Sequence, residues 1–127
     1  VENTAGGKNS VARYMDSIER LWEIIGHLNV GLCLDTCHTW AGGIPTIDAV
    51  KGFKKLVKKI DLIHFNDSKD GFESSRDRHE NLGKGKIPKE ELEYVIKNAK
   101  TDIIVETPNG PDAQKKDIAW IRRRLKK

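Results

Sequence analysis

The sequence predicts an α/β fold in which parallel strands alternate with helices. Two observations carry this prediction. Stretches with apolar residues every three or four positions alternate with short, nearly continuous apolar runs, and these are the patterns of amphipathic helices and buried strands. Such alternation is typical of parallel strands joined by crossover helices. With 127 residues the chain has the length of one domain or of part of a larger one, and we assign residues 1–127 to a single domain.

The first elements are a helix, a strand and a second helix. In residues 10–25 apolar side chains recur on one helical face, with Ser10 placed as an N-cap and Gly26 placed to end the helix. Residues 30–34 are a short apolar run, as in a buried strand. Residues 47–60 alternate lysines with apolar positions, which predicts a second amphipathic helix.

The rest of the chain continues this alternation. Residues 61–65 predict a buried strand, and residues 66–87 form a long polar loop of the kind that is usually functional or disordered. A helix over 88–99 has a proline at its start, a strand covers 102–106, and a helix with one apolar row covers 113–126. The basic C-terminal end fits a solvated helix end better than a contact with DNA.

Composition narrows the class of protein. Charged residues make up 33% and hydrophobic residues 37% of the chain, and no apolar run reaches the ~20 residues of a membrane helix. We therefore expect no membrane partner. The formal charge of +4 is compatible with a phosphate-bearing partner without proving one. Two cysteines are too few for a secreted disulfide framework, so we expect an intracellular location, in the cytoplasm or in a eukaryotic nucleus.

Carboxylates and imidazoles gather where the predicted strands end. In parallel α/β folds the carboxyl ends of the strands are where active sites are built. Imidazole nitrogen and carboxylate oxygen are ligands for zinc, and seven candidates exceed the needs of one tetrahedral ion. The sequence therefore predicts more than one metal ion. The candidate ligands are Glu2, on the tail of a strand at the N-terminus, Asp35, His38, His64, Asp77, His79 and Glu106.

Each candidate also has a simpler interpretation when it is taken alone. His64 could be a hydrogen-bonded core histidine, and Asp35 could cap the segment that follows its strand. Glu106 could be a surface residue, and Asp77 with His79 could belong to a solvated charge run. Their joint placement at one edge of the sheet favours the metal site.

Two further features of the sequence point less clearly to a function. Cys33 and Cys37 are expected to be structural thiols, although Cys37 lies among the candidate ligands. The glycines and lysines of residues 81–87 could let a phosphate approach the backbone, but their spacing matches no phosphate-binding motif, so ordinary glycine turns are the simpler interpretation.

Five ordered blocks of this sequence resemble the signature blocks of endonuclease IV, the zinc-dependent apurinic/apyrimidinic endonuclease family of base-excision repair. The blocks are residues 2–6, 31–38, 63–69, 75–85 and 105–108. The resemblance implies a TIM-type (β/α)₈ barrel with three zinc ions, acting on double-stranded DNA. It implies hydrolysis of the phosphodiester on the 5′ side of an abasic site, leaving a 3′-hydroxyl and a 5′-deoxyribose phosphate.

The resemblance also implies roles for individual residues. Glu2 resembles a carboxylate that bridges two zinc ions, and both Glu2 and Glu106 resemble catalytic residues; Glu106 would orient or deprotonate the attacking water. By their positions in the blocks, Asp35, His64 and Glu106 resemble the remaining ligands of one of these two ions. In the same way, His38, Asp77 and His79 resemble the ligands of the third ion. Asn66, Lys69 and Arg78 are lesser candidates for contact with DNA phosphate.

A complete barrel of this type needs about 250 residues. The chain therefore resembles only the C-terminal half, from the tail of strand five to strand eight. Two further histidine ligands of the family would lie in the missing N-terminal half, and the complete enzyme would be a monomer. The activity of the isolated chain is accordingly in question.

Two alternative functions stay open on the sequence. One is a metal-dependent sugar isomerase or epimerase on a related barrel, against which the number of ligands argues. The other is a catalytically inactive fragment that binds metal or DNA.

Overall fold

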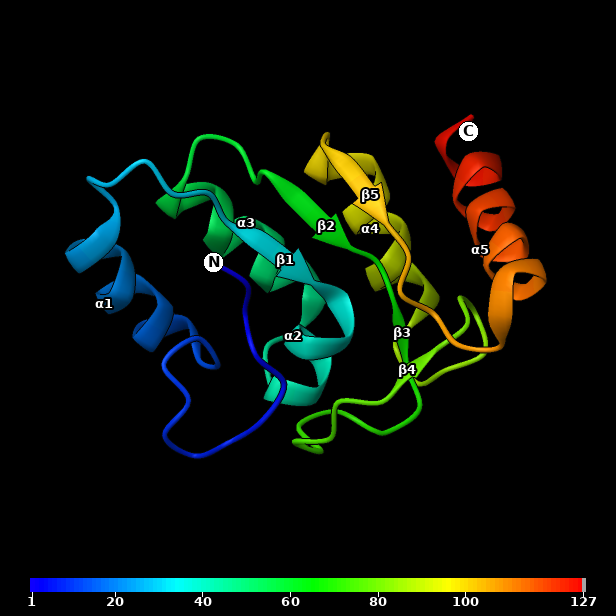
Figure 1. Cartoon of the computed structure of the whole chain (residues 1–127), viewed down its shortest axis with the longest axis horizontal. Coiled ribbons are helices and arrows are strands. Elements are labelled where there is room, and N and C mark those ends of the chain that lie inside the picture. Colours follow the sequence, from blue (N-terminus) through cyan, green and yellow to red (C-terminus); the bar gives the residue numbers. More distant parts are fainter. Residues whose placement is uncertain (127) are drawn as a thin grey trace.

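The computed structural model describes residues 1–126 and shows a parallel sheet with helices packed along it (Figure 1). Helix α1 packs on α3, α3 on α4 and α4 on α5, so that α1 and α5 lie at the two ends of the molecule in Figure 1. The elements in chain order are α1 (Met15–Ile25), β1 (Cys33–Asp35), α2 (Thr36–Gly42), α3 (Thr46–Leu56), β2 (Leu62–His64), β3 (Asp67–Ser68), β4 (His79–Glu80), α4 (Lys89–Ala99), β5 (Asp102–Ile104) and α5 (Gly110–Leu125).

The strands of the main sheet are all parallel, as the alternating pattern predicts. Their order is β1-β2-β5, with Asp35 opposite His64 and His64 opposite Ile104. Glu2 adds a parallel bridge to Cys33, on the other side of β1 from β2. The register therefore brings Glu2, Asp35 and His64 to one edge of the sheet.

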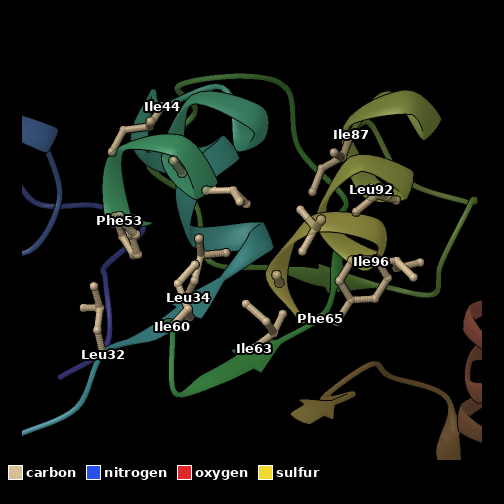
Figure 2. Close-up of a cluster of buried hydrophobic side chains, with 14 of the residues drawn as sticks. Leu32, Leu34, Ile44, Phe53, Ile60, Ile63, Phe65, Ile87, Leu92 and Ile96 are labelled. Carbon is tan, nitrogen blue, oxygen red and sulfur yellow. The ribbon is translucent and has the colours of Figure 1, made fainter. Parts of the chain in front are cut away.

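The core lies between this sheet and helices α3 and α4 (Figure 2). Phe53 of α3, Ile63 of β2 and Leu92 of α4 are fully buried. Burying an apolar side chain of this size stabilises a fold by about 1.5–3 kcal/mol. The packed core holds the strands rigidly, and the strands in turn hold the polar residues at their carboxyl ends.

The first helix is shorter than its apolar pattern predicts. It begins at Met15 with Tyr14 as N-cap, so Ser10 does not cap it. Residues before Met15 instead turn back toward the N-terminal segment, and Thr4 donates a backbone hydrogen bond to Ala12 (2.8 Å). The predicted end is confirmed, since Gly26 is the C-cap.

Helix α2 is an element that the pattern of apolar residues does not predict. Its seven residues directly follow β1, and the Asp35 side chain caps it by accepting a hydrogen bond from the backbone N–H of His38 (3.0 Å). Gly43 ends the helix in the left-handed conformation, with φ of 98°. An aspartate cap and a closing glycine are signals of a helix, but the helix is too short to show a clear apolar period.

The long polar segment 66–87 is structured rather than a plain loop. Strands β3 and β4 form an antiparallel pair, with Ser68 opposite His79. The buried carboxylate of Asp67 accepts hydrogen bonds from the backbone N–H groups of Gly83 (3.0 Å), Gly85 (3.1 Å) and Ile87 (3.1 Å). These N–H groups are therefore taken by Asp67 and are not free to cradle a phosphate.

The predicted end of α4 at residue 99 and the predicted start of β5 at residue 102 are confirmed, whereas most other boundaries differ by one to a few residues. Pro88 is the N-cap of α4 rather than its first helical residue, and α5 begins at Gly110 rather than at residue 113. Among the described residues, no helix is long and apolar enough to cross a membrane.

Candidate metal centre

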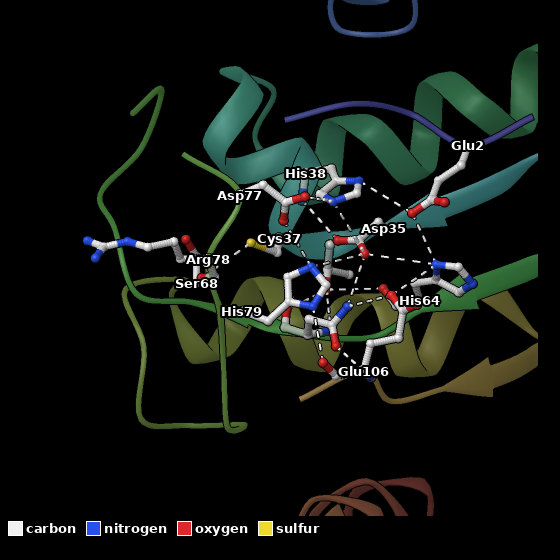
Figure 3. A network of polar contacts seen from close by, with 12 residues as sticks. Glu2, Asp35, Cys37, His38, His64, Ser68, Asp77, Arg78, His79 and Glu106 are labelled. Carbon is white, nitrogen blue, oxygen red and sulfur yellow. Dashed lines mark hydrogen bonds and ion pairs between the residues drawn. The ribbon is translucent and has the colours of Figure 1, made fainter. Parts of the chain in front are cut away.

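The structure brings all seven predicted ligands together at the carboxyl ends of the strands (Figure 3). They come from separate segments of the chain: the N-terminal segment, the end of β1, α2, the end of β2, β4 with the residues just before it, and the residues after β5. They form two sets, in each of which one ligand atom per residue lies within 4.8 Å of the others. We call Glu2, Asp35, His64 and Glu106 the carboxylate group, and His38, Asp77 and His79 the histidine group.

In the carboxylate group, three acidic side chains surround one imidazole nitrogen. His64 Nδ1 lies 3.1 Å from Glu2 Oε1, 3.1 Å from Glu106 Oε2 and 4.0 Å from Asp35 Oδ2. One nitrogen can donate only one proton, so a hydrogen bond cannot satisfy all three oxygens. One imidazole and three carboxylates form a donor set that suits zinc.

In the histidine group, the two rings aim the same nitrogen at one carboxylate. Nε2 of His38 lies 3.0 Å from one oxygen of Asp77, and Nε2 of His79 lies 3.1 Å from the other. Both Nε2 atoms are buried, and neither has a hydrogen-bond partner among the described residues.

Backbone carbonyls fix which ring nitrogen of these two histidines carries a proton. Nδ1 of His38 contacts the carbonyl oxygen of Asn3 (2.8 Å), and Nδ1 of His79 contacts that of Glu106 (3.2 Å). A carbonyl only accepts, so each Nδ1 carries a proton, and Nε2 is the nitrogen that would offer a lone pair to a metal. Histidine ligands of metals are held in this way, and the orphaned Nε2 atoms therefore fit a bound cation.

Asp35 lies between the two groups. Its side chain is fully buried, and its Oδ2 lies 3.7 Å from His79 Nε2 and 3.9 Å from His38 Nε2. The side-chain amide of Asn66 donates to the same oxygen (3.0 Å). Asp35 is thus both the cap of α2 and the centre of the cluster, so the two interpretations of this residue are compatible.

The electrostatics of the cluster favour a cation. Burial raises the pKa of Asp35 above its ordinary value. Burial of His38 opposes its protonation, but the carboxylates of Asp35 and Asp77, with the Asn3 carbonyl, outweigh this effect and raise the pKa of His38. Among the ion pairs of the described residues, those with lysine or arginine involve only Asp70 and Glu93. Within residues 1–126, the four acidic side chains of the cluster therefore have no ion pair with a lysine or arginine.

The two cysteines lie close to the cluster. Cys37 is buried and can share a site with Asp35 and His79, while Cys33 is half-buried. Burial raises the pKa of the Cys37 thiol to about 12 and that of Cys33 to about 11. Because the thiolate is the form that binds metal, protonated thiols suit the structural role predicted for both.

The three candidates for phosphate contact lie in different surroundings. Asn66 is buried, and its side-chain oxygen accepts from the backbone N–H of Glu106 (2.8 Å), so it orients ligands from behind. Arg78 forms a bidentate ion pair with Asp70, in which its guanidinium donates to the two carboxylate oxygens at 2.7 and 2.5 Å. Lys69 is exposed.

Sequence reasoning missed Asn3, which is buried beside the cluster. Besides offering its carbonyl to His38, its side-chain oxygen accepts from the backbone N–H of Asp35 (2.8 Å), and its amide donates to the Asp35 carbonyl (3.2 Å). The only signal was its position next to Glu2 in the first signature block.

The fold and the cluster together define part of a parallel α/β barrel with a candidate metal centre at the carboxyl ends of its strands. The chain belongs to the xylose isomerase-like TIM barrel family, whose model matches residues 1–124. This confirms the predicted fold class.

The curated relatives of this chain include proteins named probable endonuclease 4. The chain is 46% identical over 125 residues to the probable endonuclease 4 of Mycobacterium ulcerans, covering 98% of this chain and 49% of the relative. It is 48% identical over 124 residues to that of Mycobacterium bovis, covering 98% of this chain and 48% of the relative. The resemblance to the endonuclease IV family is confirmed, and the chain spans about half the length of these relatives.

A solved structure shows the same arrangement of the backbone. The crystal structure of endonuclease IV from Thermus thermophilus matches with a TM-score of 0.78 at 31% identity, over 99% of this chain and 49% of that one. The described fold therefore corresponds to about half of that structure.

Proposed function

We propose that this chain supplies about half of a zinc-dependent DNA-repair endonuclease, which hydrolyses the phosphodiester on the 5′ side of an abasic site in double-stranded DNA. The observation that carries the proposal is the pair of buried, unpartnered Nε2 atoms of His38 and His79 facing Asp77, beside a second group of four ligands. The names of the relatives support an endonuclease, and the role in base-excision repair follows from the family resemblance.

The two groups would each hold one zinc ion. A third ion would use Glu2 together with ligands from outside this chain, as the family resemblance implies. Bound zinc supplies Lewis acidity toward a phosphoryl oxygen and toward water. Clustered cations also stabilise the charge that develops on a phosphoryl group.

The chain's own residues divide the remaining work. The side chains of Glu2 and Glu106 are 37% and 41% exposed, whereas Asp35 is fully buried. Within the carboxylate group, Glu2 and Glu106 can therefore reach a substrate at the mouth of the site, whereas Asp35 cannot. Glu106 would orient the attacking water and take its proton. The side-chain oxygen of Asn66 accepts a hydrogen bond from the backbone N–H of Glu106 (2.8 Å) and so holds this residue in place. Lys69 and Arg78 would contact DNA phosphate.

The first test counts zinc. The purified chain, dialysed against zinc and analysed for metal content, should hold two ions, because two ligand groups are complete within it. A content near zero would contradict the proposed sites, and a content of three would mean that a second copy supplies the missing ligands.

The second test measures incision. In a chimera, this chain replaces the matched segment of the Mycobacterium ulcerans relative, and the substrate is a duplex with one abasic-site analogue. Zinc-dependent cleavage on the 5′ side is expected, and Glu106→Gln should reduce its rate by at least about 100-fold. A chimera that folds and binds zinc but does not cut would overturn the proposed activity.

The same preparations test the alternatives. Turnover of a ketose without incision would favour a sugar isomerase, the activity that the family's description suggests. Binding of abasic DNA without incision would favour an inactive fragment. We further propose that the complete protein is a monomer with one barrel domain and acts inside the cell.

A further inference from the structure

Asp117 is a buried acidic residue of α5 that lies outside the ligand cluster. It is only 3% exposed. Its carboxylate accepts hydrogen bonds from the side-chain amide of Asn81 (2.7 Å), the backbone N–H of Leu82 (2.9 Å) and the hydroxyl of Thr107 (2.6 Å). The ion pairs of the described residues do not include it. Three donors, rather than a cation, thus compensate the buried charge.

The segments that Asp117 joins both carry candidate ligands. Asn81 lies two positions after His79, and Thr107 directly follows Glu106. Asn81 also donates to the carbonyl of Pro108 (3.0 Å) and accepts from the side chain of Asn109 (2.7 Å). The two segments are therefore tied together behind the site.

The hydrogen bonds between these two segments fix the distance between His79 and Glu106 in the candidate centre. His79 belongs to the histidine group and Glu106 to the carboxylate group, and Nδ1 of His79 contacts the Glu106 carbonyl (3.2 Å). Figure 3 shows these two side chains on neighbouring segments. Any shift of residues 79–82 against 106–109 would move one group against the other and loosen the contact that fixes the His79 ring.

We propose that Asp117 is a positioning residue, which fixes His79 relative to Glu106 and so sets the zinc affinity of both groups. The inference rests on the zinc sites of the proposed function. Removing the carboxylate leaves three buried donors without their acceptor, and the strain falls on the two ligand-bearing segments. Mutating residues that support metal ligands through hydrogen bonds typically lowers metal affinity by about 10–100-fold.

The test separates positioning from general stability. Asp117→Ala is compared with Ile121→Ala, one helical turn later, where Ile121 is 6% exposed and anchors α5 by apolar packing. Asp112→Ala removes a carboxylate at an exposed position of the same helix and serves as the control for loss of an acidic side chain as such. For each variant, chemical unfolding in a chelator gives the stability, competition with a chromogenic chelator gives the zinc affinity, and amide hydrogen exchange follows the Leu82 N–H.

Asp117→Ala should lower zinc affinity by about 10–100-fold and speed exchange at Leu82. Ile121→Ala should lose stability while its zinc affinity changes much less, and Asp112→Ala should resemble the wild type. Equal zinc affinities in Asp117→Ala and Ile121→Ala, at similar stability, would overturn the inference.

Thr107→Val keeps the test decisive if Asp117→Ala does not fold. It removes one donor and nearly preserves shape, so it should weaken zinc binding in the same direction but by less. An unchanged affinity in Thr107→Val would also overturn the inference. A wild-type chain that binds no zinc would instead overturn the proposed metal sites, and the two failures are thus distinguishable.

Discussion

His38 and His79 illustrate how single contacts orient a candidate metal ligand. Each ring is held at Nδ1 by a backbone carbonyl, so that Nε2 faces the cluster. The remaining histidine outside the cluster, His27, is exposed near the end of α1. The contrast provides a matched pair for mutation.

His79→Ala should remove one zinc ion per chain and weaken the remaining site, because it deletes a ligand of the histidine group. His27→Ala should leave the zinc content unchanged. Elemental analysis of both variants after dialysis gives the count. Equal zinc contents in the two variants would argue against the ligand assignment.

The raised pKa of His38 predicts a pH dependence of the metal-free chain. A group whose pKa is higher in the folded than in the unfolded state contributes stability that is complete below its ordinary pKa and is lost as the pH rises through the folded value. For His38 the loss should therefore begin above its ordinary value of 6.5. Zinc affinity should change in the opposite sense, because metal and proton compete for Nε2.

Chemical unfolding in a chelator at about pH 6 and about pH 8 measures this dependence. The wild-type chain should be less stable at the higher pH, and the difference should shrink in His38→Asn. His27→Asn is the control, with an unchanged difference. If His38→Asn kept the full difference, another group would be responsible.

At the scale of elements, the segment between β3 and α4 is shaped by one carboxylate. Asp67 takes up backbone N–H groups from residues 83, 85 and 87, and so folds a polar stretch that lacks an apolar core of its own. Gly85 lies against Asp67 and the carbonyl of Ser68 so closely that a Cβ atom would overlap with both.

Gly85→Ala should therefore destabilise the chain by about 1–3 kcal/mol, the usual cost of forcing atoms into a filled space. Gly71→Ala is the matched control, since nothing lies within 4 Å of a Cβ atom added there. Chemical unfolding of the two variants measures the difference. A Gly85→Ala variant as stable as Gly71→Ala would mean that the segment relaxes freely.

At the scale of the whole molecule, apolar side chains are exposed at both ends of the sheet. Ile104, Ile118 and Leu125 are 48%, 39% and 57% exposed beside the open edge of β5, and Ile24 of α1 is 69% exposed at the opposite end. Of the predicted apolar row of α5, Ile121 is therefore buried, whereas Ile118 and Leu125 are exposed. Open sheet edges and apolar patches favour association.

The double variant Ile118→Ser and Leu125→Ser should lower the fluorescence of a bound hydrophobic dye and reduce self-association in sedimentation. Its stability should change by less than about 1 kcal/mol, because exposed positions contribute little. Ile121→Ser, at the buried neighbour, should instead unfold more easily. Unchanged dye binding in the double variant would place the exposed apolar surface elsewhere.

Much of the fold and the site could be predicted because the signals are local. Apolar periodicity predicts the α/β class and the main elements, and the carboxylates and histidines follow strands whose ends must meet in a parallel sheet. The signature blocks, such as residues 75–85, predict the groups that the ligands form, and the structure brings those residues together.

What the tertiary structure alone decided depends on contacts between residues far apart in the sequence. Ser10 loses its capping role because Thr4 pairs with Ala12, and the glycine-rich residues 83–87 are folded by Asp67. The tautomers of His38 and His79, and the tie from Asp117 to Thr107, likewise need the folded chain. Apolar periodicity shows which face of a helix or strand is buried. These polar contacts instead depend on the distances and orientations of residues that only the folded chain brings together. The sequence by itself thus determined the kinds of candidate ligand and their order along the chain, and the tertiary structure decided how each of these side chains is held.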